Sequence, residues 1–500
     1  MGSASTSTST GRRSGFREIL YSVIGLVIML LGFVLPAVGP ITPVGMRVIF
    51  IFVGALFLWS TIGAIWPSLA AVFLFGLCGY YGEGAAGFIP TLTTVYGDET
   101  FIQVMMMFIF FGAVKESGAM SYVARWILSR KILNRRPYLL VAAIAFTAYL
   151  MSFATNAQSS IMIMWSILGD ICLVLGLKHY EDSLWTYIWG AAFLGAGLGH
   201  CAMPYKTTGL AMLRVYENIT KGQYPINGIV YLVFSLIMAI VMIAALCALM
   251  RIFKTDTSKA KALSPAEMNS RNPLPPMTKV QKIYLYALPL FVILLFLPAV
   301  SALQSFPPIA WLDSINALGV TVAFIVILGI WRVDGASVLD FQKAAKNNVI
   351  WKVLFLMIAA KHVGQALADS ELGIVAAIKS VLTPILGGKP ELLFVFFIIL
   401  AAMVLTNVGN NVSISIALTP VVLAFVGDYG ISPAPVMICV MMEVFASALL
   451  TPAASTPCAM CYGASEYSPK EIRKYGIPLA IFSVFAYTLI GYPLAKLFLG

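Results

Sequence analysis

The feature that most constrains this chain is a series of long apolar runs, each close to the length of a membrane-spanning helix. Crossing the hydrocarbon core of a bilayer takes about 20 apolar residues in a helix, and such runs recur from residues 19–38 to the end of the chain. A soluble protein could not cover them, because hydrophobic residues make up 60% of the sequence and charged residues only 11%. The sequence therefore predicts an all-α polytopic membrane protein with about 11 transmembrane helices plus re-entrant hairpins.

Basic residues lie between the apolar runs rather than in one stripe. The net charge of +11 therefore fits the positive-inside rule for membrane proteins, and we expect no nucleic-acid partner. We predict a disordered cytoplasmic tail over residues 1–18 and a basic, Pro-containing cytoplasmic linker over residues 251–282. The expected location is the inner (plasma) membrane, with the N-terminus in the cytoplasm.

A repeat divides the rest of the chain. Thr155-Asn156-Ala157 and Thr406-Asn407-Val408 both interrupt apolar runs, and their asparagines lie 251 residues apart. Pro204 and Pro457, in two later interruptions, lie 253 residues apart. We predict a first helix and a first inverted repeat over residues 19–250, and a second inverted repeat over residues 283–500. Inverted repeats with discontinuous helices are typical of secondary transporters.

The polar interruptions are candidate binding sites. Backbone that leaves a helix inside a membrane must line protein or water, because lipid cannot satisfy its polar groups. Asparagine amides and half-helix N-termini favour anions, whereas hydroxyl, amide and freed carbonyl oxygens suit a hard cation such as sodium. We therefore predict binding roles for Thr155, Asn156, Thr406 and Asn407. The alternative is that the amides only hold helices together, each contributing about 0.6 kcal/mol.

Later in each half, further residues break the helix pattern. Thr451-Pro452 and Thr456-Pro457 do so in the second half, where Ser455 and Thr456 offer hydroxyls. In the first half the predicted breaks are Gly197, Gly199 and Pro204. A plain kinked helix is the alternative in both places.

Three ionisable residues lie close to these breaks or inside an apolar run. Lys206, beside a break, could pair with an anionic substrate or stand in for a coupling cation, unless it reaches water at the interface. His200 is either a proton relay or a hydrogen-bonded structural histidine. Glu443 is a candidate for proton coupling, with a helix-packing ion pair as the equal alternative.

No enzyme motif is present. The sequence contains no HExxH, no GxSxG and no phosphate loop, and the three histidines stand in no recognisable pattern. The seven cysteines are scattered without metal-ligand spacing, so we expect them to be small core residues. A membrane-embedded enzyme or receptor would need a soluble domain or a large pocket facing water, and the longest polar stretch is the linker.

On these motifs the sequence resembles the divalent-anion/sodium symporter family of the ion-transporter superfamily. That family carries two Ser-Asn-Thr motifs, one per inverted repeat, each followed by a broken element with a Thr-Pro-Pro-Asn-like loop. Thr155-Asn156-Ala157 and Thr406-Asn407-Val408 match the first motif at its asparagine, and Ser455-Thr456-Pro457 matches the loop. The resemblance extends over nearly the whole chain from about residue 20.

The resemblance implies an anion and sodium as ligands and no other cofactor. It also implies a substrate-carrying domain that slides like an elevator against a homodimeric scaffold. The implied first sodium site comprises Thr155, Asn156 and Gly199. The implied second sodium site comprises Thr406, Asn407 and the backbone near Thr451 and Ala454. The resemblance also implies that the anion contacts Asn156, Asn407, Thr456 and Pro457.

The chain departs from the family pattern in two ways. The third motif residue is Ala157 in one half and Val408 in the other, and Lys206 stands where the loop asparagine is expected. We hypothesise that Lys206 supplies a fixed charge in place of one sodium. The predicted function is secondary transport of a small anion, most simply a dicarboxylate-like acid, coupled to sodium or protons. The alternative is another permease or antiporter of the superfamily, for an inorganic or metalloid anion.

Overall fold

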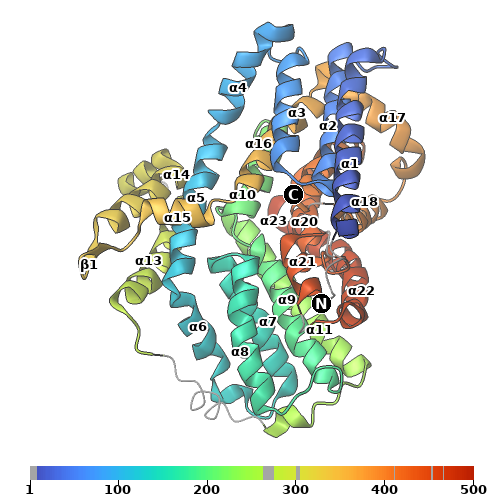
Figure 1. Ribbon diagram of the computed structural model, residues 1–500. Coiled ribbons are helices and arrows are strands. Elements are labelled where there is room, and N and C mark those ends of the chain that lie inside the picture. The colour runs from blue at the N-terminus through green and yellow to red at the C-terminus, as the bar shows by residue number, and fades with distance from the viewer. Residues whose placement is uncertain (1–7, 263–274, 300–304, 410, 452–453, 465–466) are drawn as a thin grey trace, which may run out of the picture.

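A computed structural model describes residues 8–262, 275–299, 305–409, 411–451, 454–464 and 467–500, which are almost entirely helical (Figure 1). Within these residues, ten helices are long and apolar enough to cross a membrane, or up to 11 if the bent pair α15 and α16 counts as one span. The predicted all-α polytopic architecture is confirmed.

Within the described residues, the first half contains eleven α-helices. They are α1 (Thr8–Val34), α2 (Pro43–Thr61), α3 (Ile65–Leu77), α4 (Phe88–Tyr96), α5 (Glu99–Ser117), α6 (Ala119–Leu128), α7 (Pro137–Ala154), α8 (Ala157–Val174), α9 (Ser183–His200), α10 (Thr207–Ile219) and α11 (Gly228–Ile252).

The second half contains a similar set. It comprises α13 (Lys279–Phe296), α14 (Pro307–Ile330), α15 (Phe341–Asn348), α16 (Trp351–Leu367), α17 (Ile374–Leu386), α18 (Glu391–Thr406), α19 (Asn411–Tyr429), α20 (Pro433–Ala446), α21 (Thr456–Gly463), α22 (Pro469–Ala486), the π-helical turn η7 (Tyr487–Gly491) and α23 (Tyr492–Leu499). The described strands are two short ones, β1 (Arg332–Val333) and β2 (Ala336–Ser337), which pair in antiparallel fashion.

The tail prediction is wrong over residues 8–18, which are the first turns of α1. Once the apolar part of α1 is helical, each further residue adds a hydrogen bond without a new nucleation cost. Residues 1–7 of the predicted tail and residues 263–274 of the predicted linker lie outside the described residues. At the linker's end, Thr278 and Gln281 form a capping box that starts α13.

Two pairs of helices form hairpins. The first hairpin consists of α7 and α8, and the second of α18 and α19. In the first, Asn156 is extended, and its Oδ1 accepts the Ser159 N–H at 2.8 Å, so the side chain caps a new helix at the turn. The Thr-Asn pairs therefore mark hairpin tips rather than kinks within a span.

Two helices are broken instead of reversed. Residues 201–206 separate α9 from α10, and residues 447–455 separate α20 from α21. The predicted breaks at Gly197 and Gly199 are wrong, because both residues lie inside α9. A Cβ on Gly199 would lie 2.2 Å from the Tyr149 carbonyl oxygen, so this glycine allows α9 to approach α7 closely.

The order of elements recurs in the two halves. A short helix, a hairpin, a broken helix and a long helix follow one another from α6 to α11 and again from α17 to the C-terminus. The short helices α6 and α17 both begin after a left-handed glycine, Gly118 with φ 69° and Gly373 with φ 70°. The repeat seen in the sequence motifs thus extends to the elements that carry them.

We name two sets of helices by their place in the chain, the core (α7–α11 and α18–α23) and the scaffold (α1–α6 and α13–α17). In Figure 1, α7, α8, α9 and α11 lie together at the bottom, while α13, α14 and α15 lie on the far side of α5. Both hairpins and both broken helices belong to the core, so every motif singled out by the sequence lies there.

Candidate functional site

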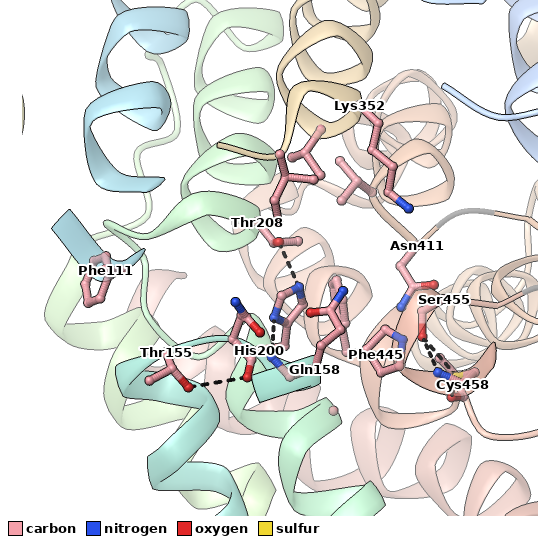
Figure 2. Close-up of a pocket in the computed structure, with 18 of the residues that line it drawn as sticks. Phe111, Thr155, Gln158, His200, Thr208, Lys352, Asn411, Phe445, Ser455 and Cys458 are labelled. Atoms are coloured by element: carbon pink, nitrogen blue, oxygen red, sulfur yellow. Dashed lines mark hydrogen bonds between the residues drawn. The ribbon is translucent and has the colours of Figure 1, made fainter. Parts of the chain in front are cut away.

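A partly open cavity lies where the core meets the scaffold. Both hairpins, the ends of α9 and α10 that flank the first break, the second break, α5 and the start of α16 contribute to its lining (Figure 2). The space within its outline, open solvent included, is about 1030 Å³. Elements far apart in the sequence therefore share one chamber.

Four helix N-termini meet at this cavity. Its lining includes Ala157 at the start of α8, Thr208 at the start of α10, Asn411 at the start of α19 and Pro457 at the start of α21. Each helix N-terminus carries unpaired N–H groups and a partial positive charge of roughly half an elementary charge. The cavity is therefore suited to an anion.

The first hairpin presents its tip to the cavity. Thr155, Asn156 and Gln158 all line it. Thr155 directly follows the last residue of α7, and its hydroxyl donates to the Met151 carbonyl at 2.6 Å. Gln158 Oε1 is buried without a hydrogen-bond partner among the described residues.

His200 joins the first hairpin to α10. Its Nδ1 lies 3.3 Å from the Ala157 backbone N–H, which can only donate, so Nδ1 accepts. The proton of the neutral ring is then on Nε2, which donates to the Thr208 hydroxyl at 3.1 Å (Figure 2). Both nitrogens are bonded, as the structural interpretation of His200 predicts.

The second hairpin contributes a different asparagine. Asn411 lines the cavity, whereas Thr406 and Asn407 are not part of its lining. Thr406 Oγ1 lies 3.0 Å from Asn411 Oδ1 and 2.9 Å from the Val444 carbonyl oxygen. The Asn411 amide nitrogen is buried and has no partner among the described residues. That nitrogen is a donor available to a ligand.

Asn407 is bonded within the core. Its Nδ2 donates to the Met403 and Ser447 carbonyls, both at 2.9 Å, and its Oδ1 accepts the Leu450 N–H at 3.0 Å. The Thr451 hydroxyl donates to the Asn407 carbonyl. Asn407 therefore fastens the second hairpin to the break between α20 and α21.

Lys206 is almost fully buried at the break between α9 and α10. Its ammonium donates to the Ser152 and Phe153 carbonyls at 2.5 and 2.9 Å, and lies 5.2 Å from the centre of the Phe111 ring. Both carbonyls belong to the last turn of α7, where the helix dipole favours a cation. Lys206 therefore does not reach water, and it is not part of the cavity lining.

The remaining predicted residues lie around the second break. Ser455 and Pro457 line the cavity, and the Ser455 hydroxyl accepts the Cys458 N–H at 3.3 Å as the cap of α21. Ala454 is buried just before them. Thr456 begins α21, and its side chain lies outside the described part.

Among the scaffold residues at the cavity, two polar ones were missed by sequence reasoning. Asn348 lines it and donates to Glu116 Oε1 at 2.9 Å. Lys352 also lines it, and its ammonium extends from the scaffold toward Asn411 (Figure 2). The signal was weak, since Lys352 stands at the start of an apolar run where a basic residue usually marks a helix end.

Reversed and broken helices whose polar ends meet inside an apolar helical body define a membrane-embedded secondary transporter. Residues 17–498 match the family described as the sodium:sulfate symporter transmembrane region, so the chain belongs to this family. The resemblance to divalent-anion/sodium symporters is confirmed. Family membership implies an anionic substrate and a coupling ion.

Solved structures show the same fold. The YdaH transporter of Alcanivorax borkumensis has a TM-score of 0.59 at 15% identity, covering 95% of this chain and 97% of its own. MtrF of Neisseria gonorrhoeae, described with a class of antimetabolite efflux pumps, has a TM-score of 0.58 at 16% identity, covering 95% and 98%. Both are transporters rather than enzymes. The comparison with curated proteins gives no match.

Proposed function

We propose that this protein carries a small, doubly charged anion across the inner (plasma) membrane, bound in the cavity between the two hairpins. The observation that carries the proposal is the meeting of four helix N-termini at one cavity. Donors reach it from both halves, with Asn411 on one side and the first hairpin tip on the other.

The first substrate class to test is a dicarboxylate-like acid, whose two charged ends would match the two hairpins. Sulfate is the second, because the family takes its description from sulfate symport. Of the predicted residues, Thr155, Asn156, Ser455 and Pro457 would act directly. Asn407 and Thr406 would act by holding Asn411 and the second break in place.

The coupling ions would differ between the halves. In the first half, the Lys206 ammonium donates to the Ser152 and Phe153 carbonyls at the end of α7. We therefore propose that the lysine charge takes the place of a sodium ion in this half. In the second half, the oxygens of Asn407 and Thr451 gather without a buried amine in the described residues nearby. They are the proposed sodium site, with Thr406 and the Ala454 backbone beside them.

Transport would be an elevator motion of the core against the scaffold. In support, two bonds at the cavity, His200 to Thr208 and Asn348 to Glu116, each join residues of one set of helices. The recurring order of elements supports two inverted repeats. The remaining parts of the proposal are a homodimer built on the scaffold and a cytoplasmic N-terminus.

The direct test is uptake into proteoliposomes. Labelled succinate, citrate, sulfate and amino acids are offered separately, with sodium and pH varied independently. We expect uptake of a doubly charged anion that depends on an inward sodium or proton gradient. Uptake of amino acids alone, or of none of these compounds, would contradict the proposal.

The role of Lys206 predicts a specific change in ion dependence. Lys206→Met should reduce uptake at least about tenfold, since a hydrogen bond to a charged group contributes about 1.5–3 kcal/mol, and the remaining uptake should depend more steeply on sodium. Lys206→Arg, which keeps the charge, should retain the wild-type sodium dependence. An unchanged rate and unchanged ion dependence in Lys206→Met would reject the assignment.

A further inference from the structure

A carboxyl group lies fully buried inside the core, away from the cavity lining. It is Glu443 of α20. Its Oε1 lies within hydrogen-bond distance, 2.7 Å, of the Ser483 hydroxyl oxygen of α22. Its Oε2 is buried and has no hydrogen-bond partner among the described residues.

The groups that face Glu443 are neutral. They are Ser483 of α22, Ser447 and Cys439 of α20, and Tyr487 of η7, with Cys201 and Tyr149 of the first half beyond Tyr487. Within the described part of the chain, no Lys, Arg or His forms an ion pair with it. The helix-packing ion pair expected as the alternative from the sequence is therefore wrong.

A buried carboxylate without a counter-ion or a full set of hydrogen bonds is strongly disfavoured. In this conformation the group must therefore carry a proton. The Ser483 hydroxyl has a single proton, and it also lies 2.8 Å from the Ala480 carbonyl, which can only accept. The Glu443 proton therefore has its place on Oε1, which donates it to the Ser483 oxygen.

Glu443 is connected to the second hairpin by one short path. The Ser447 hydroxyl donates to the Glu443 carbonyl at 2.8 Å, and the Ser447 carbonyl accepts from Asn407 Nδ2 at 2.9 Å. Phe445, two residues further along α20, lines the cavity. The π-helical turn η7, of a kind found often at functional sites, packs against α20. A movement of the break after α20 would therefore change the surroundings of the carboxyl group.

We propose that Glu443 binds a proton that crosses the membrane together with the substrate. The proton is held on the carboxyl group in the conformation described above. It is released to water when the interface between α20 and α22 opens in another conformation, and a new proton is taken up from the opposite side. This inference rests on the proposed transport function and adds a proton to its coupling ions.

The first test does not depend on transport. Infrared spectra of the lipid-reconstituted full chain at neutral pH should contain a carboxylic acid C=O band that Glu443→Gln lacks. Glu391→Gln is the matched control, because Glu391 is a core carboxylate that is paired with Lys496 at 2.7 Å, and it should retain the band. A wild-type spectrum without the band, or a band that persists in Glu443→Gln, overturns the proposal.

The second test follows the proton. Uptake of labelled succinate or sulfate by wild-type vesicles should acidify the lumen, as reported by an enclosed pH-sensitive dye. Glu443→Gln, which mimics the neutral acid, should still exchange labelled for unlabelled anion but lose the acidification and the pH dependence of net uptake. Glu443→Asp should shift the pH profile, which keeps the test open if the Gln variant folds poorly.

The outcomes separate the two proposals. Exchange with no acidification in the wild type, or equal acidification in Glu443→Gln, contradicts proton coupling and leaves anion transport intact. Absence of exchange for every anion contradicts the proposed transport function, and with it the proton's role in transport, whereas the infrared band still decides whether Glu443 holds a proton.

Discussion

At the scale of the residue, the two motif asparagines have separate tasks despite their matching sequence contexts. Asn156 caps α8 and lines the cavity. The Asn407 side chain makes three hydrogen bonds inside the core. The sequence predicted both as helix interruptions, because a Thr-Asn pair offers hydrogen bonds that compete with the helix. Which asparagine faces the ligand depends on the rotation of each hairpin, which no local pattern encodes.

This difference predicts that alanine substitution at Asn407 mainly affects stability, whereas alanine substitution at Asn156 mainly affects transport. Asn407→Ala should lower the Tm of the purified protein clearly, since leaving a buried partner unsatisfied costs about 1–3 kcal/mol. Asn156→Ala should lower the Tm less, since losing a helix cap costs about 1 kcal/mol, and it should raise the KM of anion uptake. Thermal unfolding in detergent and uptake kinetics measure the two effects. A stable Asn407→Ala protein with a raised KM would mean that Asn407 contacts the substrate.

Lys352 supplies a positive charge to the cavity from the scaffold. Lys352→Gln should therefore raise the KM for the anion several-fold with a smaller effect on kcat, and the difference should shrink at high ionic strength, where exposed charges are screened. Lys346→Gln, an exposed change on the neighbouring helix α15, is the control and should behave like the wild type. Equal KM values for both variants would exclude Lys352 from binding.

At the scale of the element, glycine spacing allows α7 and α9 to pack closely. Beside Gly199, Gly195 would place a Cβ 2.0 Å from the Ala145 carbonyl oxygen. The sequence analysis predicted Gly197 and Gly199 as breaks, because glycine disfavours helices. In lipid, however, small residues allow helices to approach. The helix continues to His200, and the break occupies residues 201–206, which include the predicted Pro204.

The packing explanation predicts a contrast between two glycines on one helix. Gly199→Ala should destabilise the protein by about 1–3 kcal/mol, because backbone cannot move aside as a side chain can. Gly197→Ala should not destabilise the protein, since the added Cβ would meet only the Phe445 carbonyl oxygen, at 3.5 Å. Thermal unfolding of both variants measures this, and a Tm of Gly199→Ala at or above that of Gly197→Ala would contradict the close contact.

At the scale of the whole molecule, composition was enough to predict the architecture. Long apolar runs and few charges allow little besides a helical membrane protein. Hydropathy could not show that α7 and α8 form a hairpin with its tip at the cavity, because both helices are as long and apolar as the other candidate spans. Nor could hydropathy place the start of α16 at the cavity, since that contact joins scaffold and core segments that are distant from one another in the sequence.

The central claim is that both halves of the chain hold one anion in one cavity. The most direct measurement is a cryo-EM structure of the reconstituted protein, saturated with whichever of succinate or sulfate it transports, in the presence of sodium. The account predicts ligand density between the first hairpin tip at Asn156 and the start of the second hairpin's α19 at Asn411. Density that contacts only one hairpin, or that lies outside this cavity, would contradict it.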